Sequence, residues 1–264
     1  RGWPWEHPLR WGGLIDPSMF TVVTKTLTYG PRRGNLRWWN PFRCVRFVRD
    51  GVVNAVGLTN PGFRWWCDEI GPDVRRRKVP IVVSLLSDDI AELAEMARAV
   101  SVFDIVGIEL NASCPNTGRD MSNAWKVIDA CHAIKAASHL PLILKLSVIH
   151  DHRTILEQVG DVVEAVAVNS VPWRIAFPPK RPSPLEKFGG GGVSGKAVQN
   201  LTWTMVRRLV GAVPVIGPSV WEYDDIARLR ALGASAVSFG SVFLRYPWRP
   251  TLFARRDIAE RKRS

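Results

Sequence analysis

The feature that most constrains this chain is the regular alternation of short apolar segments with longer amphipathic ones. The apolar segments are almost continuously hydrophobic, which is typical of parallel strands buried on both faces. The segments between them repeat apolar residues at helical spacing, and this alternation favours a parallel sheet with helical connections. We expect strands at 21–27, 80–86, 105–110, 142–146, 165–168, 213–216 and 236–239, and helices at 88–100, 123–137, 153–159, 198–210, 223–232 and 252–263.

This pattern predicts an α/β fold of the (β/α)8 TIM-barrel type, with a single domain over residues 1–264. The pattern supplies seven strands, so we expect the first strand of the barrel to precede Arg1. Two long segments interrupt the alternation. Residues 29–63 contain turn signals and are predicted to form a hairpin-bearing loop. Residues 171–195 are rich in Pro and Gly and are predicted to form a mobile loop over one end of the barrel.

Composition excludes several classes of protein. Hydrophobic residues make up 46% of the chain and charged residues 23%, a balance that rules out a disordered protein. No apolar run approaches the roughly 18 residues that a membrane helix needs, so no membrane partner is expected. The cysteines Cys44, Cys67, Cys114 and Cys131 show neither CxxC pairing nor zinc-ligand spacing. Their spacing therefore predicts no metal site and favours a reducing cytoplasm.

The formal net charge of +12 is concentrated in clusters. Six arginines lie between residues 32 and 49, and residues 75–78 read RRRK. Clustered basic charge attracts phosphates, so a nucleic-acid partner is one interpretation. A solvated face or a subunit contact explains the same clusters, and we favour that interpretation over nucleic acid.

Polar side chains follow several of the predicted strands, at the ends where barrel enzymes place their functional residues. Amide side chains suit a planar ring that carries amide groups, and an ionised thiol accepts a proton. A lysine stabilises negative charge on an electron-accepting ring. This set predicts a site at the carboxyl ends of the strands, formed by Lys25, Asn54, Asn111, Cys114, Lys145, Asn169 and Ser170. The histidines at 132, 139, 150 and 152 are expected at the surface.

Residues 109–118 read ELNASCPNTG, which resembles the signature of the dihydroorotate dehydrogenase family, FMN enzymes built on a (β/α)8 barrel. The resemblance continues along most of the chain. It includes VTKT at 23–26, RGN at 33–35, VNAVGLTNPG at 53–62, PLILKLS at 141–147 and GGVSG at 191–195.

The resemblance implies a role for individual residues. Cys114 is expected to be the base that removes the C5 proton of dihydroorotate while the C6 hydride passes to flavin N5. A cysteine at this position, in place of serine, resembles the soluble class of the family. The substrate-binding residues implied are Lys25, Asn54, Gly57, Leu58, Asn111, Asn116, Asn169 and Ser170. The FMN-binding residues implied are Lys25, Thr26, Asn111, Lys145, Gly195, Gly217, Ser219, Gly240 and Ser241.

One departure from the family pattern concerns the phosphate of FMN. The family has a G-x-G-G turn after the seventh strand, whereas this chain has Gly217-Pro218-Ser219-Val220. Side chains in place of glycine restrict φ and crowd a phosphate. Two alternatives therefore stay open beside oxidation of dihydroorotate to orotate in pyrimidine biosynthesis. One is a flavoenzyme that reduces uridines in RNA, and the other is a basic, non-catalytic barrel that has lost FMN.

The sequence leaves the electron acceptor open between fumarate, a nicotinamide cofactor reached through a partner subunit, and a quinone. The family resemblance favours a homodimer.

Overall fold

The structure, a computed structural model, describes residues 6–113 and 123–263. Within these residues, seven strands form one parallel sheet in which the spatial order follows the chain. The strands of this parallel sheet, in order, are β1 (Val22–Val23), β4 (Ile81–Leu85), β5 (Gly107–Asn111), β6 (Leu142–Leu146), β7 (Ala165–Val168), β10 (Val215–Gly217) and β11 (Ala236–Val237). All seven overlap the predicted strands, and the prediction of a parallel sheet is confirmed.

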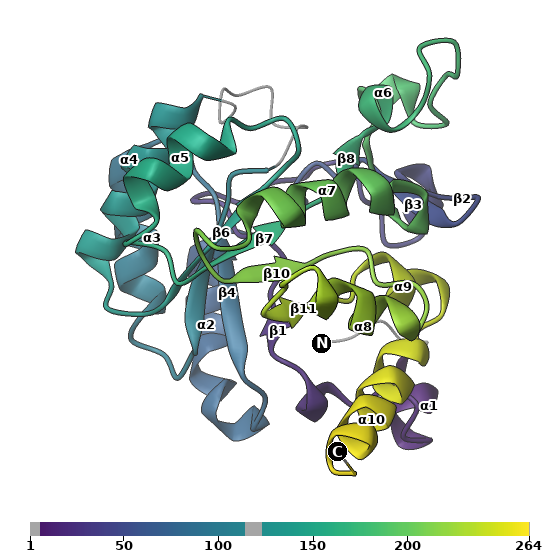
Figure 1. Cartoon of the computed structure of the whole chain (residues 1–264). Helices are drawn as coiled ribbons and strands as arrows, with labels where there is room; N and C mark the ends of the chain where they lie inside the picture. Colours follow the sequence, from purple (N-terminus) through teal and green to yellow (C-terminus); the bar gives the residue numbers. More distant parts are fainter. Residues whose placement is uncertain (1–5, 114–122, 264) are drawn as a thin grey trace.

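The parallel sheet curls, and helices cover its outer side (Figure 1). The helices are α1 (Glu6–Trp11), α2 (Phe63–Glu69), α3 (Ile90–Val100), α4 (Ala124–Ala137), α5 (His152–Val159), α6 (Trp173–Ala176), α7 (Gln199–Leu209), α8 (Asp224–Ala231), α9 (Ser241–Arg245) and α10 (Arg249–Arg261). This is the predicted barrel-like α/β fold. At one edge of the sheet, Val22 and Val23 of β1 are 37% and 42% exposed, whereas every residue of β4 and β5 is buried. The further strand expected before Arg1 stays a prediction.

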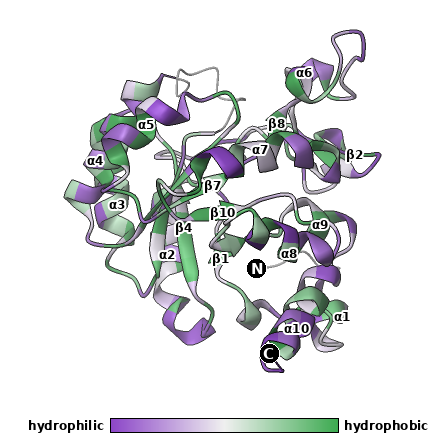
Figure 2. Cartoon of the chain, viewed as in Figure 1, coloured by the Kyte–Doolittle hydropathy of each residue, from purple (hydrophilic) through white to green (hydrophobic). Residues whose placement is uncertain are grey.

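Helix α3 shows how the sequence specifies these elements. The Asp89 side chain accepts hydrogen bonds from the backbone N–H groups of Ala91 and Glu92, which caps the helix. Leu93, Met96, Ala97 and Val100 are buried, and this spacing places all four on one helical face. Figure 2 shows the result for the whole chain, with hydrophobic residues along β4 and β10 and hydrophilic residues along much of α10.

A second, smaller sheet lies beside the carboxyl ends of the parallel strands. Its described strands are β2 (Val45–Val48), β3 (Gly51–Asn54), β9 (Gly192–Gly195) and β8 (Val171–Pro172), paired antiparallel in the order β2-β3-β9-β8. The pair β2–β3 confirms the hairpin predicted within 29–63. Both ends of the loop predicted over 171–195 are strands, because β9 pairs with β3 of the hairpin and β8 pairs with β9. The mobility of the segment stays a prediction. The assignment of both sheets to a single domain over residues 1–264 stays a prediction.

Gly195, the last residue of β9, packs closely against Trp221 and supports a prediction about stability. Its φ is +103°, and a Cβ there would lie 2.9 Å from the Trp221 ring and 3.0 Å from the Asp50 carbonyl oxygen. Gly195→Ala is therefore expected to lower the free energy of unfolding by about 2 kcal/mol or more, measured by urea denaturation. Gly211→Ala is the matched control, because φ is +95° there but nothing lies within 4 Å of the added Cβ. Equal losses in the two variants would show that the packing against Trp221 contributes nothing.

Candidate active site

A cavity of about 260 Å³ lies between the carboxyl ends of the parallel strands and the small sheet. Most of the residues predicted from strand ends and from the family resemblance line it. The predicted residues in the lining are Lys25, Thr26, Asn54, Gly57, Leu58, Asn111, Lys145, Asn169 and Ser170, and Thr24, Val56 and Gly192 complete it. The structure therefore brings together residues from distant parts of the chain, as a binding site requires.

The strand register explains this convergence. Asn111 of β5 pairs with Lys145 of β6, so both side chains leave the sheet at the same level. On the opposite wall, Asn54 is the last residue of β3 and pairs with Gly192 of β9. The small sheet therefore supplies one wall of the cavity, and the parallel sheet supplies the other.

A partly buried ion pair joins the cavity residue Lys145 to Glu109 beneath it. The Lys145 ammonium lies 3.2 Å from Glu109 Oε1, and the two side chains are 25% and 3% exposed. The same carboxylate oxygen accepts a hydrogen bond of 2.7 Å from Ser84 Oγ. Glu109 is not among the residues predicted for the site. The sequence feature that could have indicated Glu109 is its position two residues before Asn111 on one strand, because residues i and i+2 of a strand share a face.

The predicted phosphate-binding residues lie outside this cavity, on the side of the molecule where β10 and β11 end. Gly217 ends β10, Ser241 begins α9, and α9 packs against β3 and β9, the strand that contains Gly195. A Cβ added at Gly240 would meet nothing within 4 Å, so the Gly240–Ser241 corner is open.

Ser219 adopts the backbone conformation that the family pattern gives to glycine, with φ at +65°. Its hydroxyl accepts a hydrogen bond from Thr202 Oγ1 at 3.3 Å, and its carbonyl accepts one from Gln199 Nε2 at 2.8 Å. The N–H groups of Ser219, Val220 and Gly240 donate to no described residue. Free N–H groups at consecutive positions suit an anion, so the residues of this turn fit a phosphate despite its side chains.

Two predicted site residues, Cys114 and Asn116, lie outside the described residues. The last described residue before them in the sequence is Ser113, whose hydroxyl donates to Asn111 Oδ1 at 2.6 Å and accepts from Asn169 Nδ2 at 2.6 Å. Ser113 was not predicted as a site residue, although it lies inside the quoted motif.

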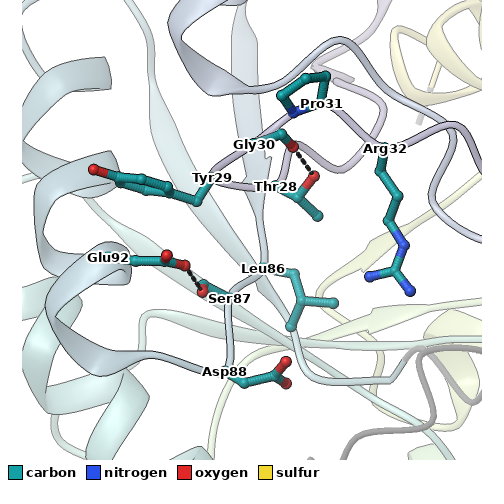
Figure 3. A pocket seen from close by; sticks show the side chains of 9 residues that line it. All are labelled: Thr28, Tyr29, Gly30, Pro31, Arg32, Leu86, Ser87, Asp88 and Glu92. Carbon is teal, nitrogen blue, oxygen red and sulfur yellow. Dashed lines mark hydrogen bonds between the residues drawn. The ribbon is translucent and has the colours of Figure 1, made fainter.

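A second hollow, of about 320 Å³, opens where β1 and β4 end. Figure 3 shows its lining, in which the Thr28 hydroxyl donates to the Gly30 carbonyl oxygen at 2.7 Å and the Ser87 hydroxyl donates to Glu92. None of its lining residues was predicted for the site.

The surface position predicted for His150 is wrong, and His152 is partly buried, while His132 and His139 are exposed as predicted. His150 is 5% exposed, and its Nδ1 accepts a hydrogen bond from the Ser147 N–H at 3.1 Å. His152 Nε2 lies 3.1 Å from the Ser147 carbonyl oxygen. Both rings therefore pack just beyond the carboxyl end of β6, four and six residues after Leu146, and help to fix the segment that follows Lys145.

Burial lowers the pKa of His152 below its ordinary value of 6.5, an effect that the hydrogen bond with Ser147 opposes. The unfolded chain then binds more protons than the folded chain below pH 6.5. We expect the free energy of unfolding contributed by this group to be constant above pH 6.5 and to fall as the pH is lowered through the folded-state pKa. Urea denaturation between pH 5 and 8 checks this. His152→Gln should flatten the fall, whereas the exposed control His139→Gln should not.

The fold and the site together define a class of protein: a barrel-like α/β enzyme whose polar cavity, formed by amides and lysines, lies at the carboxyl ends of parallel strands. Comparison with known proteins identifies the family. The family model described as "Dihydroorotate dehydrogenase" matches residues 13–249. The chain therefore belongs to the dihydroorotate dehydrogenase family of oxidoreductases, which are flavin-dependent.

Curated relatives agree with this assignment. The chain is 32% identical over 239 residues to the "Dihydroorotate dehydrogenase B (NAD(+)), catalytic subunit" of Desulforudis audaxviator, covering 86% of this chain and 75% of the relative. It is also 32% identical over 238 residues to the protein of the same name from Methanocaldococcus jannaschii, covering 83% and 74%.

A solved structure supports the fold. The crystal structure of DHODH from Eimeria tenella in complex with ferulenol matches with a TM-score of 0.70 at 18% identity, over 89% of this chain and 72% of that one. Within the described residues, no helix has the length and apolar character to cross a membrane.

Proposed function

We propose that this chain is an FMN-dependent dihydroorotate dehydrogenase that oxidises (S)-dihydroorotate to orotate in the cytoplasm. The observation that carries the proposal is the convergence of the predicted lysines and asparagines on one cavity, in a chain that matches the family over residues 13–249. Membership of this family favours dihydroorotate over uridine in RNA. The free N–H groups around Ser219 and Gly240 favour a flavin-binding barrel over one that has lost its cofactor.

The proposed mechanism divides the work among residues of this chain. When bound, FMN supplies the acceptor for the hydride from C6 of dihydroorotate. Cys114 removes the proton from C5, and the electron pair of that C–H bond forms the double bond of orotate. Asn54, Asn111 and Asn169 hold the amide edges and carboxylate of the pyrimidine, because each amide offers both a donor and an acceptor. Asn116, Gly57, Leu58 and Ser170 complete the substrate site.

The proposed cofactor site has two parts. Lys25, Thr26, Asn111 and Lys145 contact the ring, and the ammonium of Lys145 stabilises negative charge on it. Gly195, Gly217, Ser219, Gly240 and Ser241 hold the phosphate through backbone N–H groups and hydroxyls.

We further propose NAD+ as the terminal electron acceptor, reached through a partner subunit. The relatives from Desulforudis audaxviator and Methanocaldococcus jannaschii are named as NAD(+) enzymes and as catalytic subunits, a term that implies a second subunit. A homodimer of this chain stays a prediction.

An anaerobic absorbance spectrum of the purified protein, before and after addition of dihydroorotate, tests the proposal. A yellow protein that bleaches supports cofactor, substrate and half-reaction together. A yellow protein that does not bleach contradicts the substrate, and the same titration with dihydrouridine-containing transfer RNA then tests the alternative. A colourless protein that does not take up added FMN contradicts the proposed cofactor.

A further inference from the structure

A continuous chain of hydrogen-bonded side chains runs beneath the cavity, across neighbouring strands of the parallel sheet. Asn169 Nδ2 lies 2.6 Å from Ser113 Oγ, which lies 2.6 Å from Asn111 Oδ1. Asn111 Nδ2 lies 2.8 Å from Thr26 Oγ1, which lies 3.0 Å from Ser84 Oγ. Ser84 Oγ lies 2.7 Å from Glu109 Oε1, where the chain ends. Asn169, Asn111 and Thr26 line the cavity, whereas Ser84 and Glu109 do not.

Glu109 sets the direction of this chain. Its Oε1 accepts hydrogen bonds from both Lys145 Nζ and Ser84 Oγ, so the single hydroxyl proton of Ser84 is used there. Ser84 Oγ must then accept from Thr26 Oγ1, and Thr26 Oγ1 must in turn accept from Asn111 Nδ2. The same reasoning makes Ser113 Oγ the donor to Asn111 Oδ1 and the acceptor from Asn169 Nδ2. Every donor in the chain therefore points toward the Glu109 carboxylate.

The direction of the chain fixes the orientation of two amides. If the Asn111 amide were turned over, its oxygen would face Thr26, whose proton is already committed to Ser84. If the Asn169 amide were turned over, its oxygen would face Ser113, whose proton is committed to Asn111. No described residue donates to Asn169 Oδ1, so this oxygen stays available as an acceptor for a ligand N–H. The donor and acceptor pattern of the cavity is thus decided by residues that do not line it.

We propose that Glu109 is a positioning residue that acts through Ser84 and Thr26 to set the hydrogen-bonding pattern of Asn111 and Asn169. The ligand of this pattern, a pyrimidine with amide edges, rests on the proposed function. The hydrogen-bonded chain of side chains does not rest on the proposed function, because it forms within the protein without any ligand. Glu109 is 2% exposed and Ser84 is fully buried, so any effect of replacing either one on a ligand in the cavity is transmitted through the chain or through Lys145.

The first test uses the protein alone, labelled with ¹⁵N-asparagine, and reads the side-chain amide signals of Asn111 and Asn169. Ser84→Ala and Glu109→Gln are expected to move both pairs of signals, which are assigned from Asn111→Asp and Asn169→Asp. Ser138→Ala is the matched control: it also removes a buried hydroxyl, bonded to Ser101 at 2.6 Å, but at the amino end of β6. Unmoved Asn169 signals in Ser84→Ala would overturn the proposal. If Ser84→Ala fails to fold, Thr26→Val breaks the same chain and replaces it.

The second test measures the affinity of the flavin-loaded protein for orotate by its flavin difference spectrum. Ser84→Ala leaves the contact between Glu109 and Lys145 intact, yet it is expected to raise the Kd for orotate about tenfold, since the two amides lose their fixed pattern. Ser84→Thr, which keeps the hydroxyl, should restore the affinity, and Ser138→Ala should leave it unchanged.

The two tests separate the two proposals. A loss of affinity in Glu109→Gln without one in Ser84→Ala would overturn transmission through the chain and leave Lys145 as the route. A wild-type protein that binds neither FMN nor orotate contradicts the proposed function. In that case the asparagine amide signals of the protein alone still test whether the hydrogen-bonded chain of side chains connects Ser84 to Asn169.

Discussion

Replacing Cys114 by alanine is expected to slow the reduction of bound flavin by dihydroorotate by about 10²–10⁴-fold, the usual contribution of a general base. Binding of FMN and of orotate should change little, because the proposed role of this thiol is proton removal and not binding. Rapid mixing of the flavin-loaded protein with dihydroorotate under anaerobic conditions measures the rate of this step. An unchanged rate would show that another group is the base.

The pH dependence of the same step identifies the thiol. An ordinary cysteine has a pKa near 8.5, so the wild-type rate should rise with pH toward that value and the rise should disappear in Cys114→Ala. The cysteines among the described residues, Cys44, Cys67 and Cys131, are not expected to produce this pH dependence. Burial raises the pKa of Cys44 and Cys67, and it raises that of Cys131 to about 12. Cys67→Ala is therefore the control variant, and its rate and pH profile should match those of the wild type.

The sequence predicted the parallel sheet well because the strands of that sheet are local, apolar and separated by helices, of which α3, α4 and α5 carry side-chain caps at their amino ends. Strand order followed from chain order, since neighbouring strands in this fold are consecutive in the sequence. The cavity residues followed as well, because Lys25, Asn111, Lys145 and Asn169 each come at or just beyond a strand end. Position along a strand was therefore sufficient to predict that these side chains meet.

The small sheet was not predictable in the same way. Asn54 pairs with Gly192, and the two residues are far apart in the sequence, so no local pattern connects them. The Pro and Gly residues of 171–195 indicated a loop, whereas the backbone pairing of β8 and β9 is decided by tertiary contact. The inward position of the partly buried His152 was missed for a similar reason. It lies at the start of a helix, where a local pattern does not show that its ring turns inward to Ser147.

The chain of side chains that ends at Glu109 was hidden for a different reason. Its members come from four separate segments, and each of the serines, the threonine and the asparagines taken alone has an ordinary explanation as a polar residue of the interior or of a strand end. The alternation of Glu109 and Asn111 on one face of β5 was visible, but the partners Ser84 and Thr26 are identified only by the register of β4 against β5 and of β1 against β4.

Replacing Lys145 by methionine is expected to weaken FMN binding by about 100-fold and to destabilise the fold by about 2–3 kcal/mol. Two effects add. The proposed flavin site loses the cation that faces the ring, and the Glu109 carboxylate, which is 3% exposed, loses its partner at 3.2 Å. The destabilisation stays below that of a fully buried pair because the Lys145 side chain is 25% exposed. Fluorescence titration with FMN and urea denaturation of the flavin-free protein measure the two effects separately.

The double variant Lys145→Met with Glu109→Gln distinguishes the structural role of Lys145 from its role toward the flavin. Removing both charges leaves no unpaired carboxylate, so most of the lost stability should return. The affinity for FMN should remain low, because the cation that faces the ring is still missing. Recovery of both properties would mean that Lys145 serves only to neutralise Glu109, and recovery of neither would mean that the aliphatic part of Lys145 is what the fold requires. Because Glu109 also acts on Asn111 through Ser84 and Thr26, the single variant Glu109→Gln is the matched control. Stability restored without affinity in the double variant, with near-normal FMN affinity in Glu109→Gln alone, would assign the ammonium of Lys145 to the cofactor.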